Sequence, residues 1–187
     1  LKISSMTLPL TVSPVARRCW GSTGPDVPNA EENFWEFAME WHRDTFTITD
    51  DHKKIDVPIV VRLLHEQTYW AHDIPSDAIQ RAIEHSVCFS MFEGKKLIGF
   101  ARFITDHAVF GYLEDVIIDS KFRGRGLGQW LLDCMLAHPT IASLKKLMLA
   151  TEDAHGLYKK YGFAAPAHSE WIMERYNRRA FQTGPNN

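Results

Sequence analysis

Residues 115–128 read Asp115-Val116-Ile117-Ile118-Asp119-Ser120-Lys121-Phe122-Arg123-Gly124-Arg125-Gly126-Leu127-Gly128, an apolar run that leads into a glycine-rich turn flanked by arginines. The apolar run predicts a buried strand, and the apolar spacing after the turn predicts a helix. Such a junction presents unpaired backbone N–H groups at a helix start, where they and the helix dipole attract anions. Glycines in the turn let a ligand approach the backbone closely. The stretch therefore predicts a phosphate-binding turn.

The glycine spacing narrows the kind of phosphate ligand. A dinucleotide-binding motif needs Gly-x-Gly-x-x-Gly in an early βαβ unit; Gly124 and Gly126 fit, but the third position is Gln129 and the turn lies in the second half of the chain. A nucleoside-triphosphate loop needs Gly-Lys-Ser/Thr after its glycines, and no such tripeptide follows. An Arg-x-x-Gly-x-Gly phosphate turn and an ordinary strand-to-helix connection remain.

A second motif follows at the distance that one helix and one strand require. Residues 145–149 predict a buried strand, and residues 150–163 read Ala-Thr-Glu-Asp-Ala-His-Gly-Leu-Tyr-Lys-Lys-Tyr-Gly-Phe. Asp153 is expected to cap a short helix that contains Tyr158, and Gly162 lies where that helix would end.

The two motifs, in this order, resemble those of the GCN5-related N-acetyltransferase (GNAT) superfamily. Arg123-x-x-Gly126-x-Gly128 after a Val-Ile-Ile strand is similar to the acetyl-CoA pyrophosphate loop, and the Ala-x-x-x-Tyr segment that ends at Tyr158 is similar to the motif that follows it. The resemblance covers about residues 45–176. It implies an α/β (α+β) fold, in which a mixed, mainly antiparallel central sheet has helices on both faces and splays to form an acetyl-CoA site.

Hydrophobic periodicity predicts the surrounding elements. Helices are expected after Asp56, which would cap the first of them, and after Pro75. The other expectations are an edge hairpin or a strand with a helical lead-in within 36–49, a hairpin over 87–105, a central strand over 110–118, a helix over 127–136 and a last strand over 171–176.

The length of 187 residues suits one domain. We expect an N-terminal extension over 1–44, partly packed on the domain, an N-acetyltransferase domain over 45–176 and a C-terminal tail over 177–187. The first 30 or so residues are rich in turn-forming residues and have no acidic residue before Asp26, which indicates a variable extension or the remnant of an organelle-targeting segment.

The composition limits the partners and the compartment. A net charge of −2 gives no electrostatic reason to expect binding to nucleic acid or to an anionic membrane. No apolar run is long enough to span a bilayer. Three cysteines are too few, and odd in number, for a disulfide framework, so a reducing, cytoplasmic location is expected.

The resemblance also implies the cofactor contacts. The turn is expected to hold the pyrophosphate of acetyl-CoA, the strand before it is expected to pair with the pantetheine arm, and no metal is expected. The residues implied are Arg123, Gly124, Arg125, Gly126, Leu127 and Gly128 in the turn, and Val116, Ile117 and Ile118 in the strand. Thr151 stands where many relatives have an asparagine that can touch pantetheine, so its hydroxyl is the group left to make that contact.

Acyl transfer from a thioester to an amine needs a held donor, a neutral amine and a proton or hydrogen bond for the departing thiolate. Tyr158, at the family's tyrosine position, is the expected general acid. The candidate bases are Glu114 and Asp115, with a preference for Glu114. Because strand side chains alternate, only one of the two would face the cleft unless a bulge intervenes.

The acceptor is the least determined part of the prediction. Tyr69 and Trp70 fall between the first two predicted helices, in a segment that often borders the acceptor site in this superfamily; they could equally be core residues or a homodimer contact. The resulting hypothesis is an acetyl-CoA-dependent N-acetyltransferase that acts on a primary amine of a small molecule or peptide by direct transfer in a ternary complex. The alternatives are a non-catalytic acyl-CoA-binding or partner-binding module and, less well matched, a nucleotide-binding protein.

Overall fold

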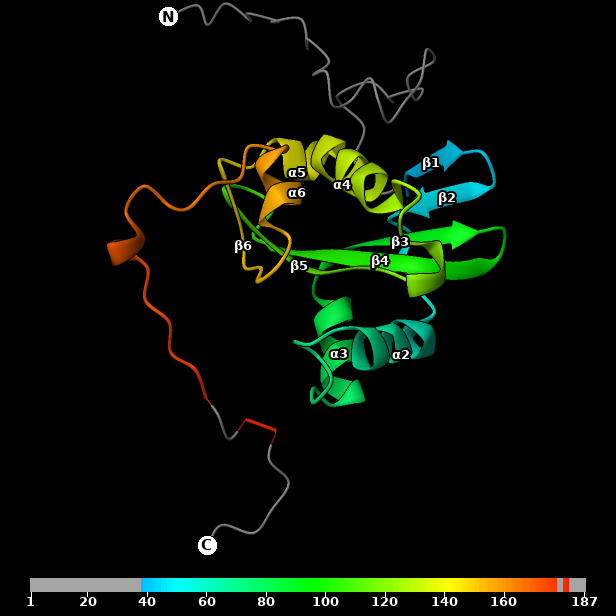
Figure 1. Ribbon diagram of the computed structural model, residues 1–187, viewed down its shortest axis with the longest axis horizontal. Coiled ribbons are helices and arrows are strands. Elements are labelled where there is room, and N and C mark those ends of the chain that lie inside the picture. The colour runs from blue at the N-terminus through cyan, green and yellow to red at the C-terminus, as the bar shows by residue number, and fades with distance from the viewer. Residues whose placement is uncertain (1–37, 178–179, 182–187) are drawn as a thin grey trace, which may run out of the picture.

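A six-stranded sheet lies between two layers of helices in the computed structural model, which describes residues 38–177 and 180–181 (Figure 1). Chain order and sheet order coincide. The strands are β1 (Glu40–Arg43), β2 (Phe46–Thr49), β3 (Val87–Glu93), β4 (Lys96–Thr105), β5 (Phe110–Ile118) and β6 (Lys146–Leu149). All neighbours are antiparallel except β5 and β6, which are parallel. The predicted mixed, mainly antiparallel sheet is confirmed.

Helices cover both faces of the sheet (Figure 1). One face carries α2 (Val57–Gln67) and α3 (Ser76–Glu84), and the other carries α4 (Leu127–Ala137), α5 (Pro139–Ala142) and α6 (His155–Lys159). Asp56 caps α2 as predicted, because its carboxylate accepts a hydrogen bond from Ile59 N–H at 3.1 Å. No helix in the described part of the chain is long and apolar enough to cross a membrane.

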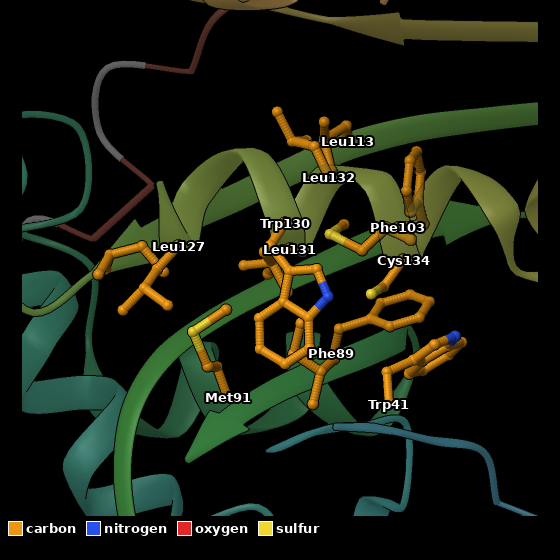
Figure 2. Close-up of a cluster of buried hydrophobic side chains, with 14 of the residues drawn as sticks. Trp41, Phe89, Met91, Phe103, Leu113, Leu127, Trp130, Leu131, Leu132 and Cys134 are labelled. Atoms are coloured by element: carbon orange, nitrogen blue, oxygen red, sulfur yellow. The ribbon is translucent and has the colours of Figure 1, made fainter. Parts of the chain in front are cut away.

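Strand alternation divides the core into two clusters. Along β3, Cys88 packs toward α2 and α3, whereas Phe89 packs toward α4. The cluster on the α4 side is shown in Figure 2; its labelled members are Trp41, Phe89, Met91, Phe103, Leu113, Leu127, Trp130, Leu131, Leu132 and Cys134. The opposite cluster includes Val60, Leu63, Leu64, Ile79, Ile83, Leu97, Phe100 and Ile117. The central strands are therefore buried on both faces, which fixes their register.

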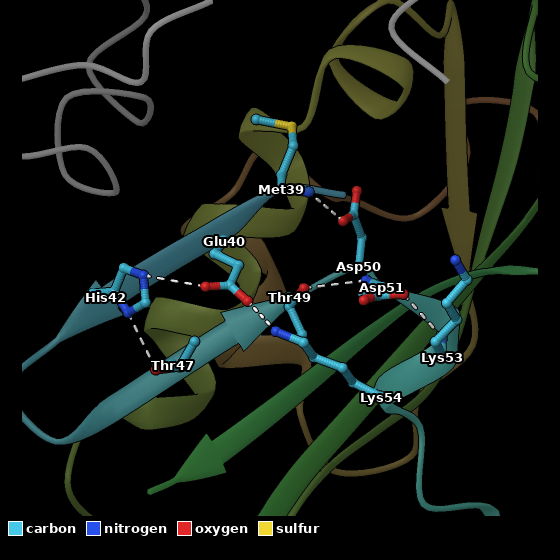
Figure 3. Close-up of polar contacts among 9 residues, drawn as sticks. All are labelled: Met39, Glu40, His42, Thr47, Thr49, Asp50, Asp51, Lys53 and Lys54. Carbon is cyan, nitrogen blue, oxygen red and sulfur yellow. Dashed lines mark hydrogen bonds and ion pairs between the residues drawn. The ribbon is translucent and has the colours of Figure 1, made fainter. Parts of the chain in front are cut away.

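The first two strands form the edge hairpin that was one of the two predictions for this region. A hydrogen bond and an ion pair stabilise the open end of this hairpin (Figure 3): Asp50 accepts a hydrogen bond from Met39 N–H at 2.6 Å, and Lys54 pairs with Glu40. Because β1 begins at Glu40, the sheet starts before residue 45, where the sequence placed the start of the domain. Residues 1–37 of the predicted extension lie outside the described residues.

The predicted last strand over 171–176 is wrong. The chain forms a 3₁₀ turn at Ser169–Trp171, where the Trp171 ring stacks on His168 at 3.9 Å between centroids, and residues 172–177 have no regular structure. Trp171, Met173 and Tyr176 are exposed. A strand needs a paired neighbour, and no strand of the described sheet pairs with this segment.

Candidate active site

A cavity opens where β5 and β6 part. The two strands pair only through Phe110–Leu113 of β5, although β5 continues to Ile118 beside β4. The edge of the last five residues of β5 is thus left without a β6 partner, and its N–H and C=O groups face a cavity of about 1280 Å³. The splayed strand pair that the resemblance implied is present.

A β-bulge brings two carboxylates to this cavity. Phe100 faces Ile117 and Arg102 faces Glu114, so that Asp115 and Val116 together lie opposite the single residue between Phe100 and Arg102. Asp115 has a φ of 55°, which L residues seldom adopt. Because the bulge breaks the alternation, Glu114 and Asp115 both line the cavity. A bulge is the exception under which the sequence allows both carboxylates to face the cleft, and the structure has that bulge.

The two carboxylates have different surroundings. Asp115 is enclosed, since one oxygen accepts from Arg102 Nε at 2.6 Å and the other from Trp70 Nε1 at 3.2 Å. The side chains of Arg102 and Asp115 are 12% and 9% exposed. Within the described residues, the Glu114 side chain makes no hydrogen bond or ion pair. Burial and then the neighbouring Asp115 charge raise the pKa of Glu114. Glu114 is the carboxylate that is free to exchange a proton.

Tyr158 lines the same cavity from α6 and is 9% exposed. Its ring meets Phe163 edge-on, with 6.0 Å between centroids. Burial, followed by the charges of Asp153, Tyr69 and Glu114, raises the pKa of the Tyr158 phenol to about 12. The phenol therefore keeps its proton at physiological pH, as a proton donor must.

The glycine-rich turn presents free backbone N–H groups to the cavity. Gly124 and Gly126 have φ values of 78° and 72°, and the Gly126 carbonyl accepts the first bond of α4 from Trp130 N–H at 3.1 Å. No backbone bond of the described chain uses the amides of residues 124–129. Gly128 has no positive φ, and an added Cβ would meet only Ile118 at 3.9 Å. Neither backbone strain nor packing requires glycine there, whereas a ligand close to the helix start would.

The other predicted cofactor residues divide into two groups. Those that line the cavity are Val116, Ile117, Ile118, Arg123, Gly124, Gly126, Leu127, Gly128 and Thr151. Arg125 is not among the lining residues; its guanidinium lies over the Phe122 ring, 5.2 Å from the centroid. Arg123 also lines the cavity, but its Nε donates to the Ile118 carbonyl at 2.8 Å.

Thr151, rather than Asp153, makes the side-chain hydrogen bond that precedes α6. The Thr151 hydroxyl accepts from Ala154 N–H at 3.0 Å, and Ala154 is the N-cap residue. The prediction of Asp153 as the cap is wrong, because Thr151 already closes this turn.

The end of α2 and the segment between α2 and α3 border the cavity on the other side. Gln67 Oε1 accepts from Ser120 N–H at 2.8 Å, and the Tyr69 hydroxyl accepts from Glu152 N–H at 3.1 Å. Tyr69 and Trp70 meet edge to face at 4.9 Å between centroids and are 49% and 39% exposed. The two predicted acceptor residues therefore lie at the cavity mouth with their rings partly open to solvent.

Arg102 is the main residue of this site that the sequence analysis did not single out. It stands in β4 among apolar residues and is almost buried. A lone arginine inside an apolar strand needs a carboxylate partner, and that signal could have paired it with a residue of the next strand. Asp73, Glu152 and Asp153 also line the cavity.

The parted strands, the free amides at a helix start, the protonated phenol and the free carboxylate surround one cavity, and this arrangement suits an enzyme that binds an extended, phosphate-bearing ligand. The chain belongs to the acetyltransferase (GNAT) family, whose family model matches residues 28–163. Acetyl transfer is the general activity of that family.

Individual similar proteins and structures are consistent with this family assignment. A solved structure from Xanthomonas campestris pv. campestris, described as a GNAT-family acetyltransferase, is 42% identical, with a TM-score of 0.70 over 74% of this chain and 97% of its own. A protein of Gibberella zeae, named as an acetyltransferase, is 29% identical over 65% of this chain and 80% of its own. A Clostridium acetobutylicum structure solved with acetyl-CoA shares the fold at 20% identity and a TM-score of 0.53, covering 70% of this chain and 94% of its own.

Proposed function

We propose that this protein is an acetyl-CoA-dependent N-acetyltransferase that transfers the acetyl group directly to a primary amine of a small molecule or peptide, within a ternary complex. The observation that supports this most is the single cavity that combines an unpaired strand edge, free amides at a helix start, a free carboxylate and a protonated phenol.

The cavity suits acetyl-CoA in two respects. The amides of residues 124–129 and the positive end of the α4 dipole would bind the pyrophosphate, since both favour an anion. The unpaired edge over 114–118 would hydrogen-bond to the pantetheine amides as an added strand would. When bound, acetyl-CoA would supply an activated thioester.

Two side chains of the cavity would manage the protons of the transfer. The Glu114 carboxylate would remove a proton from the acceptor ammonium, directly or through water, so that the neutral amine can attack the acyl carbon. Its raised pKa brings it closer to the pH at which it works. The Tyr158 phenol would donate a proton or hydrogen bond to the sulfur as the C–S bond breaks.

The test begins with thermal unfolding in the presence of excess acetyl-CoA, CoA, NAD or ATP. A ligand at about 100 times its Kd should add about 2.7 kcal/mol to the free energy of unfolding. A shift confined to the CoA species supports the proposal, and the absence of any shift contradicts it. Release of free thiol across an amine panel then identifies acceptors; binding without turnover on any amine would favour the non-catalytic acyl-CoA-binding alternative.

The proposal extends to assembly and compartment. A homodimer is supported by the large apolar side chains left exposed on the C-terminal segment, with Met173 94% exposed. Light scattering across a concentration series would test it. A cytoplasmic location is supported by Cys88 and Cys134, which are buried free thiols.

A further inference from the structure

We propose that Arg102 is a positioning residue for Glu114: through its ion pair with Asp115 it holds the bulge of β5 in the form that turns the Glu114 carboxylate toward the cavity. The inference rests on the proposed function insofar as it takes Glu114 to be the base.

The register of the two strands separates Arg102 from the residue that faces it. Arg102 lies opposite Glu114, yet its Nε donates to Asp115, one residue further along β5, at 2.6 Å. The guanidinium thus reaches past the residue across from it and holds the residue at the bulge. The pair is nearly excluded from solvent, so little water competes for these groups.

The bulge needs an external hold, because the φ of 55° at Asp115 is strained for an L residue. Both oxygens of Asp115 are occupied, one by Arg102 and the other by the indole of Trp70 at 3.2 Å. Arg102 is itself braced, since its second donor reaches Ser86 Oγ at 3.3 Å and that hydroxyl bonds to the Ala82 carbonyl. The strained backbone is therefore held by a chain of contacts that begins in α3.

Trp70 connects the same carboxylate to the cavity mouth. It belongs to the segment between α2 and α3 that borders the proposed acceptor site, and its ring is 39% exposed. The Asp115 carboxylate thus contacts both the segment between α2 and α3 and Arg102. Through these contacts it fixes the position of that segment and the orientation of the Glu114 side chain.

The charges around Glu114 predict that substitutions of Arg102 and of Asp115 shift the pKa of Glu114 in opposite directions. The titratable groups that face it are Asp115 and Tyr112 on β5, Arg102 on β4 and Tyr158 on α6. Asp115 raises the pKa of Glu114, and Arg102 lowers it. Removing the arginine should therefore raise this pKa, and neutralising Asp115 should lower it.

The experiment compares Arg102→Gln, Arg102→Lys and Asp115→Asn in the full chain. Arg81→Gln is the matched control, because it also breaks an arginine–aspartate pair, with Asp77 at 2.6 Å, but on the exposed surface of α3. The first readout is the titration of the Glu114 carboxyl carbon by ¹³C NMR, assigned with Glu114→Gln, which needs neither donor nor acceptor. The second is kcat against pH, together with KM for acetyl-CoA.

We expect Arg102→Gln to raise the Glu114 pKa by about one pH unit and Asp115→Asn to lower it by a similar amount. Arg102→Gln should reduce kcat roughly 10–100-fold with a smaller change in KM, as a misplaced base would. Arg102→Lys, which keeps the charge, should keep most of the pKa and recover part of kcat, and Arg81→Gln should change neither.

An unchanged Glu114 titration and kcat in a folded Arg102→Gln variant would overturn the proposal. If that variant does not fold, Asp115→Asn and Arg102→Lys provide the test. A Glu114 pKa that does not fall in Asp115→Asn would also overturn the proposal. Failure of the proposed function is distinguishable: full turnover by Glu114→Gln removes the base assignment, whereas the NMR titrations still report whether Arg102 and Asp115 control this carboxyl.

Discussion

The Tyr158 phenol is the residue whose surroundings most directly specify a chemical role. Burial and nearby negative charge raise its pKa to about 12, so the phenol stays protonated and can donate a hydrogen bond to the departing thiolate sulfur. Tyr158→Phe keeps the ring and its contact with Phe163 and removes only the hydroxyl. We expect kcat to fall by roughly 10²–10⁴-fold with acetyl-CoA affinity unchanged, measured by thiol release and calorimetry.

Tyr161→Phe is the control for this substitution, because it also removes a phenol hydroxyl, just after α6, and Tyr161 does not line the cavity; its hydroxyl donates to the Gln129 carbonyl at 2.9 Å. This variant should leave kcat near the wild-type value. A Tyr158→Phe variant with full kcat at every pH would show that the phenol donates no proton.

Glu114 should set the acidic limb of the pH profile. Its pKa is raised in the folded protein, so the carboxylate required of a base is lost as pH falls through a value above the ordinary 4.5. Tyr158, with a pKa of about 12, should add no alkaline limb below about pH 11. We expect kcat at saturating acceptor to rise once with pH and then level off, and Glu114→Gln to abolish that rise. The same limb persisting in Glu114→Gln would assign it to another group.

At the scale of elements, a substitution at the start of α4 is expected to weaken ligand binding without lowering stability. Gly128→Ala introduces a methyl group that meets only Ile118 at 3.9 Å, and alanine favours helix over glycine by up to about 1 kcal/mol. The variant should therefore be at least as stable as the wild type, yet its methyl group would occupy the approach to the free amides. We expect acetyl-CoA affinity to fall about tenfold, which corresponds to about 1.4 kcal/mol.

Gly156→Ala is the matched control for Gly128→Ala. Gly156 is also helical and has nothing within 4 Å of an added Cβ, but it lies in α6 and does not line the cavity. It should change stability in the same direction and leave affinity unchanged. Equal affinities for the two variants would mean that no ligand passes close to Gly128.

Elements that bury a regular stripe were predictable from the sequence. The apolar spacing located α2, α3 and α4, and the hairpin of β3 and β4, because each of these packs one defined face against the core. The bulge in β5 could be raised only as an alternative, since it depends on Arg102 and Trp70, which are distant in the sequence. The residues over 171–176 favour a strand by composition, but local 3₁₀ bonding and the lack of a paired neighbour prevail.

The candidate site likewise has features that could be predicted from the sequence and features that could not. Backbone-based features, such as the free amides of residues 124–129 and the open edge of β5, follow from a strand, a glycine turn and a helix in order, so they could be predicted. Side-chain geometry could not be: which carboxylate is free depends on the ion pair that occupies Asp115. Resemblance suggested Tyr69 and Trp70 as acceptor residues, and their hydrogen bonds to Glu152 and Asp115 supply a physical reason for their position at the cavity mouth.

For the whole molecule, the cavity is the place where the two packed layers share one ligand surface. The α4 layer contributes the glycine turn, the α2–α3 layer contributes Tyr69 and Trp70, and β5 runs between them. Acetyl-CoA should therefore slow hydrogen exchange in both layers around the cavity. The largest effect is expected at residues 124–129 and 114–118, whose amides or strand edge are unpaired in the free chain.

The β1–β2 hairpin provides the internal reference for that measurement. None of its residues lines the cavity, and it is held by its own links at Met39, Asp50 and Lys54. Its exchange should change only as far as ligand binding raises the free energy of global unfolding, which acts on all amides that open by that route. Protection near 114–129 beyond this uniform change would locate the ligand between the parted strands. A uniform change alone would mean that acetyl-CoA stabilises the fold from another surface, and the assignment of the glycine turn would then be wrong.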